Sequence, residues 1–150
     1  MFQVGANRLL DLVERHAEEI AREWWGNVRQ NPRTRSYHLL LEKQALDQAV
    51  LFYKNLRQMY DSKNPYEGVV PHFSQYAKDR YAEGIPLHEA IYAMILMRRH
   101  IWLFAEYQEL FTSALDMYGA IQVINRTVLI TDYATYITAQ EYQDLTESLS

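Results

Sequence analysis

The fold is decided by the stretch PLHEAIYAMILMRRHIWLFAEYQELF, residues 86 to 111. Its apolar residues recur every three or four positions, which predicts an α-helix. Pro86 suits the first turn of that helix, where a missing N–H costs no hydrogen bond. A helix that is apolar on two sides is either central in the fold or has a second partner surface. The two apolar faces consist of Ala93, Met97, Ile101, Phe104 and Phe111, and of Ile91, Ile95 and Trp102.

Helical periodicity also predicts four further helices, at residues 4–30, 42–60, 67–83 and 113–142. Asn31-Pro32 ends the first of them, because the residue before a proline avoids the α region. Gly84 follows the third, where a helix commonly ends on a left-handed residue. Residues 33–41 are expected to form a connector with at most a short helical turn. No stretch alternates apolar and polar residues, so we predict an all-α fold: a five-helix bundle with short connectors, or a globin-like packing.

The chain is long enough for one domain, which we place at residues 1–142, and residues 143–150 are expected to be a polar tail or the start of a linker. The expected core positions are Leu10, Val13, Ala17, Ile20, Trp24 and Val28, then Ala45, Ala49, Phe52, Tyr53, Leu56 and Tyr60, then Val69, Phe73, Tyr76 and Ala77, and in the last helix Tyr118, Ile121, Val128, Leu129 and Tyr136.

Composition excludes several classes of protein. Hydrophobic residues make up 49% of the chain, with only 5 Gly and 4 Pro, so a disordered chain is excluded. The net charge is −4, and the 15 Lys and Arg are scattered among 19 Asp and Glu, which disfavours a nucleic-acid partner. Cysteine is absent, which excludes disulfides and thiolate sites. The first residues lack the pattern of a secretory signal, and no window reaches the roughly 18 apolar residues of a membrane span. We therefore expect a cytoplasmic protein.

The motifs of common enzyme and metal sites are absent from the sequence. Di-iron bundles need Glu-x-x-His pairs, and none occurs. His88-Glu89 lacks the second histidine of the His-Glu-x-x-His zinc motif. There is no glycine-rich phosphate loop and no Gly-x-Ser-x-Gly elbow. We expect no catalytic residues, no metal site, no cofactor and no enzymatic activity.

His100 is the one histidine expected on a strongly apolar face, beside Met97 and Phe104. A buried imidazole needs a hydrogen-bond partner. His100 is therefore either a core histidine bonded to a carbonyl or a tyrosine, or a group that faces a ligand or a haem. The remaining histidines are expected at the borders of helix faces or in loops, in solvated or capping roles: His16, His38, His72 and His88.

Asn125 and Asp132 lie seven residues apart on the expected inner face of the last helix. A buried, ionised carboxylate needs a cation or several donors, and Arg80, Arg98 and Arg99 are the expected partners. The pair belongs either to a structural ion pair or to the polar lining of a ligand pocket. The residues expected to line such a pocket are His100, Asp132, Asn125, Arg98, Arg80 and Tyr76.

Three stretches, taken in order, give the chain a family resemblance. They are residues 12–24 (LVERHAEEIAREW) with 31–37 (NPRTRSY), residues 76–87 (YAKDRYAEGIPL) with 96–102 (LMRRHIW), and residues 131–136 (TDYATY) with Tyr142. Together they resemble the N-terminal domain of the RsbRD-type RsbT co-antagonists, a domain that also occurs ahead of bacterial histidine kinases. The resemblance spans residues 9 to 142.

The resemblance implies a bacterial cytoplasmic sensory or regulatory module without catalytic activity, which sits before an output domain and signals through its last helix. Related stressosome sensors are dimeric, haem-free and globin-like, and the resemblance implies the same for this chain. The turn at Gly84-Ile-Pro86 is similar to the junction before the G helix of globin-coupled sensors. Their haem ligand lies about four residues before the glycine, where this chain has Arg80, so the resemblance implies that no haem binds.

Three functions remain open. The first is a signalling input domain that dimerises and holds a small ligand. We expect a homodimer because Ile91, Ile95 and Trp102 form an apolar face beyond what one core needs, and such faces commonly mark partner surfaces. The second is a structural or adaptor module whose helices dock a protein partner. The third is a haem or gas sensor that uses His100 or His72.

Overall fold

The computed structural model describes residues 3–107 and 114–149. All regular secondary structure in these two ranges is helical, and they contain no strand. The elements are α1 (Gln3–Arg15), α2 (Ala17–Val28), the 3-10 helix η1 (Arg35–Leu39), α3 (Glu42–Asp61), α4 (Pro65–Ala82), α5 (Leu87–Tyr107) and α6 (Ala114–Ser148). The predicted all-α bundle is confirmed.

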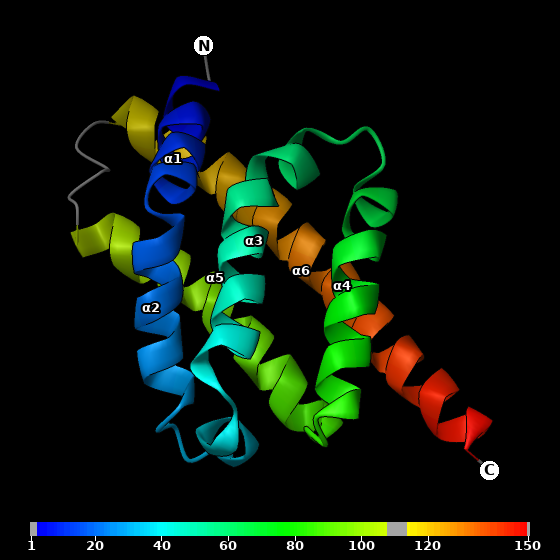
Figure 1. The fold of residues 1–150 in the computed structure, drawn as a ribbon. Helices are drawn as coiled ribbons and strands as arrows, with labels where there is room; N and C mark the ends of the chain where they lie inside the picture. Colours follow the sequence, from blue (N-terminus) through cyan, green and yellow to red (C-terminus); the bar gives the residue numbers. More distant parts are fainter. Residues whose placement is uncertain (1–2, 108–113, 150) are drawn as a thin grey trace.

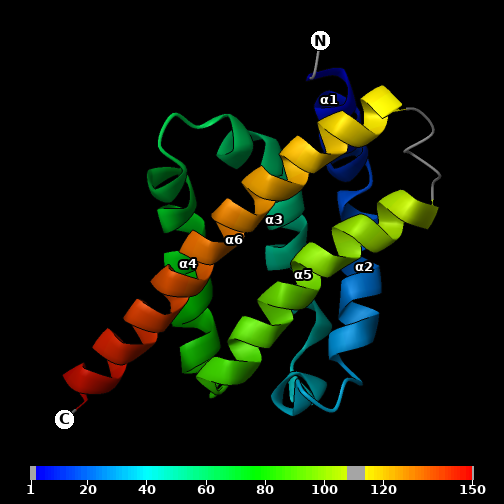
Figure 2. The same ribbon diagram turned by 180° about the vertical axis from the view of Figure 1, so that it is seen from behind.

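The helices form two layers (Figures 1 and 2). In Figure 2, α5 and α6 cross the near side of the molecule, and α1 to α4 pack behind them. α6 runs diagonally and contacts α1, α3, α4 and α5. Its 35 residues extend over about 52 Å at 1.5 Å per residue. The C-terminal end of α6 therefore projects beyond the bundle (Figure 2).

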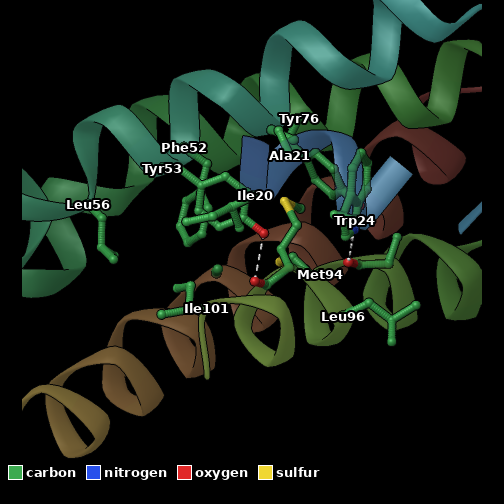
Figure 3. Close-up of a cluster of buried hydrophobic side chains, with 14 of the residues drawn as sticks. Ile20, Ala21, Trp24, Phe52, Tyr53, Leu56, Tyr76, Met94, Leu96 and Ile101 are labelled. Atoms are coloured by element: carbon green, nitrogen blue, oxygen red, sulfur yellow. Dashed lines mark hydrogen bonds between the residues drawn. The ribbon is translucent and has the colours of Figure 1, made fainter. Parts of the chain in front are cut away.

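α5 supplies much of the core, as its sequence predicts, and side chains of other helices bond to its backbone. The Trp24 indole of α2 donates to the Ala93 carbonyl at 2.9 Å, and the Tyr53 hydroxyl of α3 donates to the Met97 carbonyl at 2.7 Å (Figure 3). Both donors are buried, and a buried donor without a partner would lower the stability of the fold. These two hydrogen bonds avoid that loss. The predicted core residues Ala93, Met97, Ile101 and Phe104 are buried, and Phe111 lies outside the described residues.

The ends of α4 follow from local sequence. The Asn64 side chain accepts a hydrogen bond from the Glu67 N–H at 3.3 Å, which caps the first turn. At the other end Gly84 has a φ of +79°, a left-handed conformation that favours glycine. The Ile85 N–H then bonds to the Arg80 carbonyl at 3.0 Å and closes the helix end. The predicted role of Gly84 is confirmed.

The single N-terminal helix expected over residues 4–30 is two helices, α1 and α2, which meet at His16. The backbone leaves helical geometry there, with φ −109° and ψ 24°. The imidazole packs on Phe104 of α5 with the ring centroids 5.2 Å apart. The apolar period continues across the break, since Val13 and Ala17 are both buried. The sequence therefore shows no sign of the break, and the count of five long helices is wrong.

α6 turns inward the face opposite to the one predicted. Tyr118, Ile121, Val128 and Tyr136 are exposed by 37% to 58%, and Leu129 is half-buried. The face that does pack on the bundle is composed mainly of small or hydroxyl-bearing residues: Gly119, Val123, Thr127, Ile130, Thr131, Ala134, Ile137, Thr138 and Tyr142.

Three threonines of α6 find a hydroxyl partner within the helix, whereas the hydroxyl of Thr127 is buried without a partner among the described residues. Thr131, Thr135 and Thr138 each donate to the carbonyl four residues earlier, at 2.8 to 3.0 Å. A hydroxyl bonded in this way is satisfied without help from the neighbouring helix. Small side chains also let α6 approach its neighbours closely. Burial in α6 therefore does not follow hydrophobicity alone.

Residues 143–148 continue α6, although the sequence indicates a polar tail or a linker there. In the described ranges, no helix has the length and apolar character needed to cross a membrane.

Candidate functional site

The residues predicted to line one ligand pocket lie in separate parts of the structure. Arg80 and Tyr76 are together in the core, where α4 ends. His100 lies between α2 and α5, and Arg98 bonds to α6. Asn125 and Asp132 lie on the exposed side of α6. The pocket expected from these residues does not form.

Arg80 is fully buried and held by its own helix end. Its Nε and Nη2 donate to the Glu83 carboxylate at 2.6 and 2.8 Å. The guanidinium also lies 5.4 Å from the ring centre of Tyr76 and 6.0 Å from that of Tyr37, in reach of a cation–π interaction. Burial lowers the pKa of Arg80, but the hydrogen bonds to Glu83 and the electrostatic interactions with Tyr37, Tyr76 and Glu83 together outweigh it, and the pKa is raised. Arg80 therefore serves as a paired core cation.

The phenols around Arg80 form a buried hydrogen-bonded chain. The Tyr37 and Tyr76 hydroxyls lie 2.9 Å apart, and Tyr76 donates to the Ala90 carbonyl at 2.6 Å. Tyr142 of α6 donates to the Ile85 carbonyl at 2.9 Å in the turn before α5. Burial raises the pKa of Tyr76 to about 12 and also raises those of Tyr37 and Tyr142. The three phenols stay neutral at physiological pH. The chain of Tyr37 and Tyr76 joins η1, α4 and α5, and the separate bond of Tyr142 joins α6 to the turn before α5.

His100 is buried, as predicted, and its partner is an amide. Its Nε2 lies 3.0 Å from the Asn27 Nδ2, which donates to it. The Asn27 carbonyl oxygen is occupied by Asn31 at 2.9 Å. The Nδ1 of His100 is buried and has no partner among the described residues. Burial and the nearby charge of Arg99 lower the pKa of His100, so a neutral core histidine fits the site.

The predicted ion pair of Asp132 is wrong, because its carboxylate is exposed on the outside of α6. Arg98, one of its expected partners, instead donates from Nη1 to the hydroxyl of the neighbouring Thr131 at 2.6 Å. Arg80 is paired with Glu83. The error follows from the reversed face of α6: the face that carries Asn125 and Asp132 is the outer one.

The outer face of α6 is the first of two surfaces with a shape suited to binding. We define it by the exposed residues Met117, Tyr118, Ile121, Asn125, Val128, Asp132 and Tyr136. Positions 118, 121, 125, 128 and 132 alternate steps of three and four, the spacing of a coiled-coil seam. The residues predicted to form a dimer interface on α5, Ile91, Ile95 and Trp102, are half-buried. Ile91 and Trp102 already pack against the core.

The second surface is the α3/α4 groove, a hollow of about 1090 Å³ between α3 and α4. Gln48, Leu51 and Asn55 lie on the α3 side, and Pro71, His72 and Gln75 lie on the α4 side. The rim carries charges of both signs, from Glu14, Lys54, Arg57 and Asp61. The sequence contains no signal for this groove, because side-chain amides form no recognisable motif.

His72 contradicts the solvated or capping role predicted for it. It is half-buried against the rings of Phe52 and Phe73, with centroids 5.9 and 4.7 Å away. Burial lowers its pKa to about 4, so the imidazole is neutral at pH 7. Within the described residues its ring nitrogens have no hydrogen-bond partner. A neutral imidazole offers one donor and one acceptor to the groove.

No cluster of three or more metal-ligating side chains is found in the part of the chain that the structure describes. No protein-family model, no curated protein and no solved structure matches the chain. The resemblance to the sensory domain and the globin-like packing therefore stay predictions.

Proposed function

We propose that the chain is a bacterial signalling input domain without catalytic activity, which forms a homodimer and passes its signal through α6. The outer face of α6 is the observation that carries this proposal. Apart from Asn125 and Asp132 it is apolar, it is exposed, and it is spaced like a helix–helix seam, whereas the rest of the long apolar side chains mostly lie in the core.

A second copy of the chain suits this face better than an unrelated partner. A seam with coiled-coil spacing pairs well with the same seam on another molecule. Asn125 and Asp132 interrupt the apolar positions, and a polar residue such as Asn125 at such a position fixes register and the number of partners at some cost in stability. The half-buried strip of Ile91, Ile95 and Trp102 on α5 would widen the interface, since α5 and α6 share one side of the molecule (Figure 2).

α6 is also suited to transmit a change within the bundle. It contacts α1, α3, α4 and α5, so a shift of any of them reaches it directly. Its C-terminal end projects beyond the bundle (Figure 1), where an output domain or a signalling partner in the cytoplasm would receive the shift. A tightly packed helix transmits such a shift because packed interfaces resist continuous deformation.

Light scattering at high micromolar concentration tests the homodimer. We expect the wild-type chain to be a dimer, and Ile121→Glu to weaken it by about tenfold or more, since a buried charge is costly and each factor of ten corresponds to about 1.4 kcal/mol. Leu51→Glu is the matched control, because Leu51 is 49% exposed and Ile121 is 54% exposed. It should remain a dimer. A monomeric wild-type chain would contradict the proposal and favour an adaptor that docks a different protein.

A further inference from the structure

Two glutamines of the α3/α4 groove are held by one carboxylate. Asp79 of α4 accepts from the Gln48 Nε2 of α3 at 2.7 Å and from the Gln75 Nε2 at 2.8 Å. Each glutamine is thus anchored by its amide nitrogen, which leaves its carbonyl oxygen for another donor. The Gln48 Oε1 is buried without a partner among the described residues, and an unpaired buried acceptor carries a free-energy cost. A small movement of the Gln48 side chain toward the groove would bring this oxygen within reach of a ligand hydroxyl, whose hydrogen bond would then remove that cost.

The charges around the groove balance. Glu14 and Asp61 offset Lys54 and Arg57, and Arg57 is already bonded to the carboxylates of Asp11 and Glu14. A phosphorylated ligand is therefore not favoured, because anion sites usually present a surplus of cations or N–H donors. The groove volume of about 1090 Å³ is slightly above the roughly 300–1,000 Å³ of small-molecule sites.

We propose that the α3/α4 groove binds an uncharged, polyhydroxylated small molecule of disaccharide or nucleoside size, whose hydroxyls donate to the Gln48 and Gln75 carbonyl oxygens. Asp79 is a positioning residue, since it acts on the ligand only through the two glutamines. The imidazole of His72 and the amide of Asn55 complete the polar lining. This inference rests on the proposed signalling function, for which it names the class of ligand. α4 would carry the effect to α6, against which it packs along its length (Figure 2).

Two pairs of probes test the proposal on the full chain: trehalose with trehalose 6-phosphate, and adenosine with adenosine monophosphate. Binding is followed by nuclear magnetic resonance of the backbone and side-chain amides. We expect at least one uncharged probe to bind, to shift the side-chain amides of Gln48 and Gln75, and to bind about tenfold more tightly than its phosphate. Comparison of trehalose with adenosine shows whether the groove prefers a sugar or a nucleoside.

Two variants locate the binding. Leu51→Trp should fill the groove and abolish the shifts, whereas Leu103→Trp on α5 should leave them unchanged. The two leucines are matched in exposure, at 49% and 47%. Asp79→Asn should weaken binding severalfold, because an amide in place of the carboxylate turns one glutamine and presents its NH₂ instead of its oxygen. Retained thermal stability of Leu51→Trp shows that any loss of binding reflects the groove and not unfolding.

Several results would overturn the proposal. They are the absence of binding by both uncharged probes, tighter binding of a phosphate, shifts that map away from the groove, and shifts that survive Leu51→Trp. A haem absorption band that disappears in His72→Ala would also overturn it in favour of a haem site. Light scattering on the same samples separates the two proposals. A dimer that binds no probe leaves the signalling dimer standing, whereas a monomer that binds a probe leaves the groove site standing.

Discussion

α4 packs more extensively on α6 than on α3, and the two sides are built from different residues. On the α6 side, Tyr66 meets Tyr133 and Tyr81 meets Tyr142, each as an edge-to-face pair with centroids 5.4 Å apart. On the α3 side the groove intervenes, lined largely by amides and charged side chains. Tyrosine pairs thus join α4 to α6, whereas the α3 side combines a buried ring contact between Phe52 and Phe73 with a hollow lined by polar side chains.

The largest expected effect tests the inner face of α6. Ile130 is fully buried, so Ile130→Ala should lower the free energy of unfolding by about 2–5 kcal/mol through lost burial and a cavity. Val128→Ala, on the outer face, should cost less than about 1 kcal/mol in the isolated monomer, because Val128 is 37% exposed. Urea unfolding measures both. Equal losses for the two variants would show that the faces of α6 are assigned wrongly.

An intermediate effect tests the groove side of α4 through pH. The pKa of His72 falls from 6.5 to about 4 on folding, so its contribution to stability is full above pH 6.5 and is lost as the pH falls toward 4. Between pH 7 and pH 5 the resulting decrease in the free energy of unfolding is about 2 kcal/mol. His72→Phe should reduce the loss of unfolding free energy over that interval by this amount. His100, whose pKa is lowered too, remains in both proteins as an internal reference.

The smallest effects separate two buried threonines of α6. Thr131→Val should cost about 1–2 kcal/mol, because it removes the acceptor of the Arg98 Nη1 as well as the hydroxyl bond to its own helix. Thr138→Val should cost less than about 1 kcal/mol, since its hydroxyl bonds only to the Ala134 carbonyl, which keeps its helical partner. Thermal or urea unfolding compares them. A larger loss for Thr138→Val would contradict the assignment of Thr131 as the acceptor for Arg98.

The helices with strong apolar periods are predictable from sequence. The inner faces of α2, α3, α4 and α5 agree with the prediction. Bulky residues such as Trp24, Phe52 and Phe73 lie on one face of each helix, and burying that face removes the most apolar surface from water. α6 is different, since Tyr118 and Tyr136 resemble core residues by type whereas Thr131 and Thr138 do not. Which face of α6 turns inward depends on hydrogen bonds of its hydroxyls within the helix and on the space available beside α4. The period of apolar residues in the sequence carries no information on either.

The candidate site is less predictable than the fold. Gln75 and Asp79 are four residues apart on one helix, so their hydrogen bond can be expected from sequence. Gln48 belongs to another helix, and its meeting with Asp79 depends on how α3 and α4 are placed. The prediction that Asp132 is buried is wrong for a different reason. Its neighbours on the same helix face are apolar in the sequence, but these apolar residues are themselves exposed.

Pro71 lies inside α4, in the wall of the groove. Proline has no N–H, so α4 lacks one backbone hydrogen bond between its first turns and the remainder. A segment held by fewer hydrogen bonds opens more readily than the core around it. The first turns of α4 can thus exchange their amide protons with solvent by a local opening while the buried tyrosines hold its far end in place. A molecule in the groove would slow that exchange first.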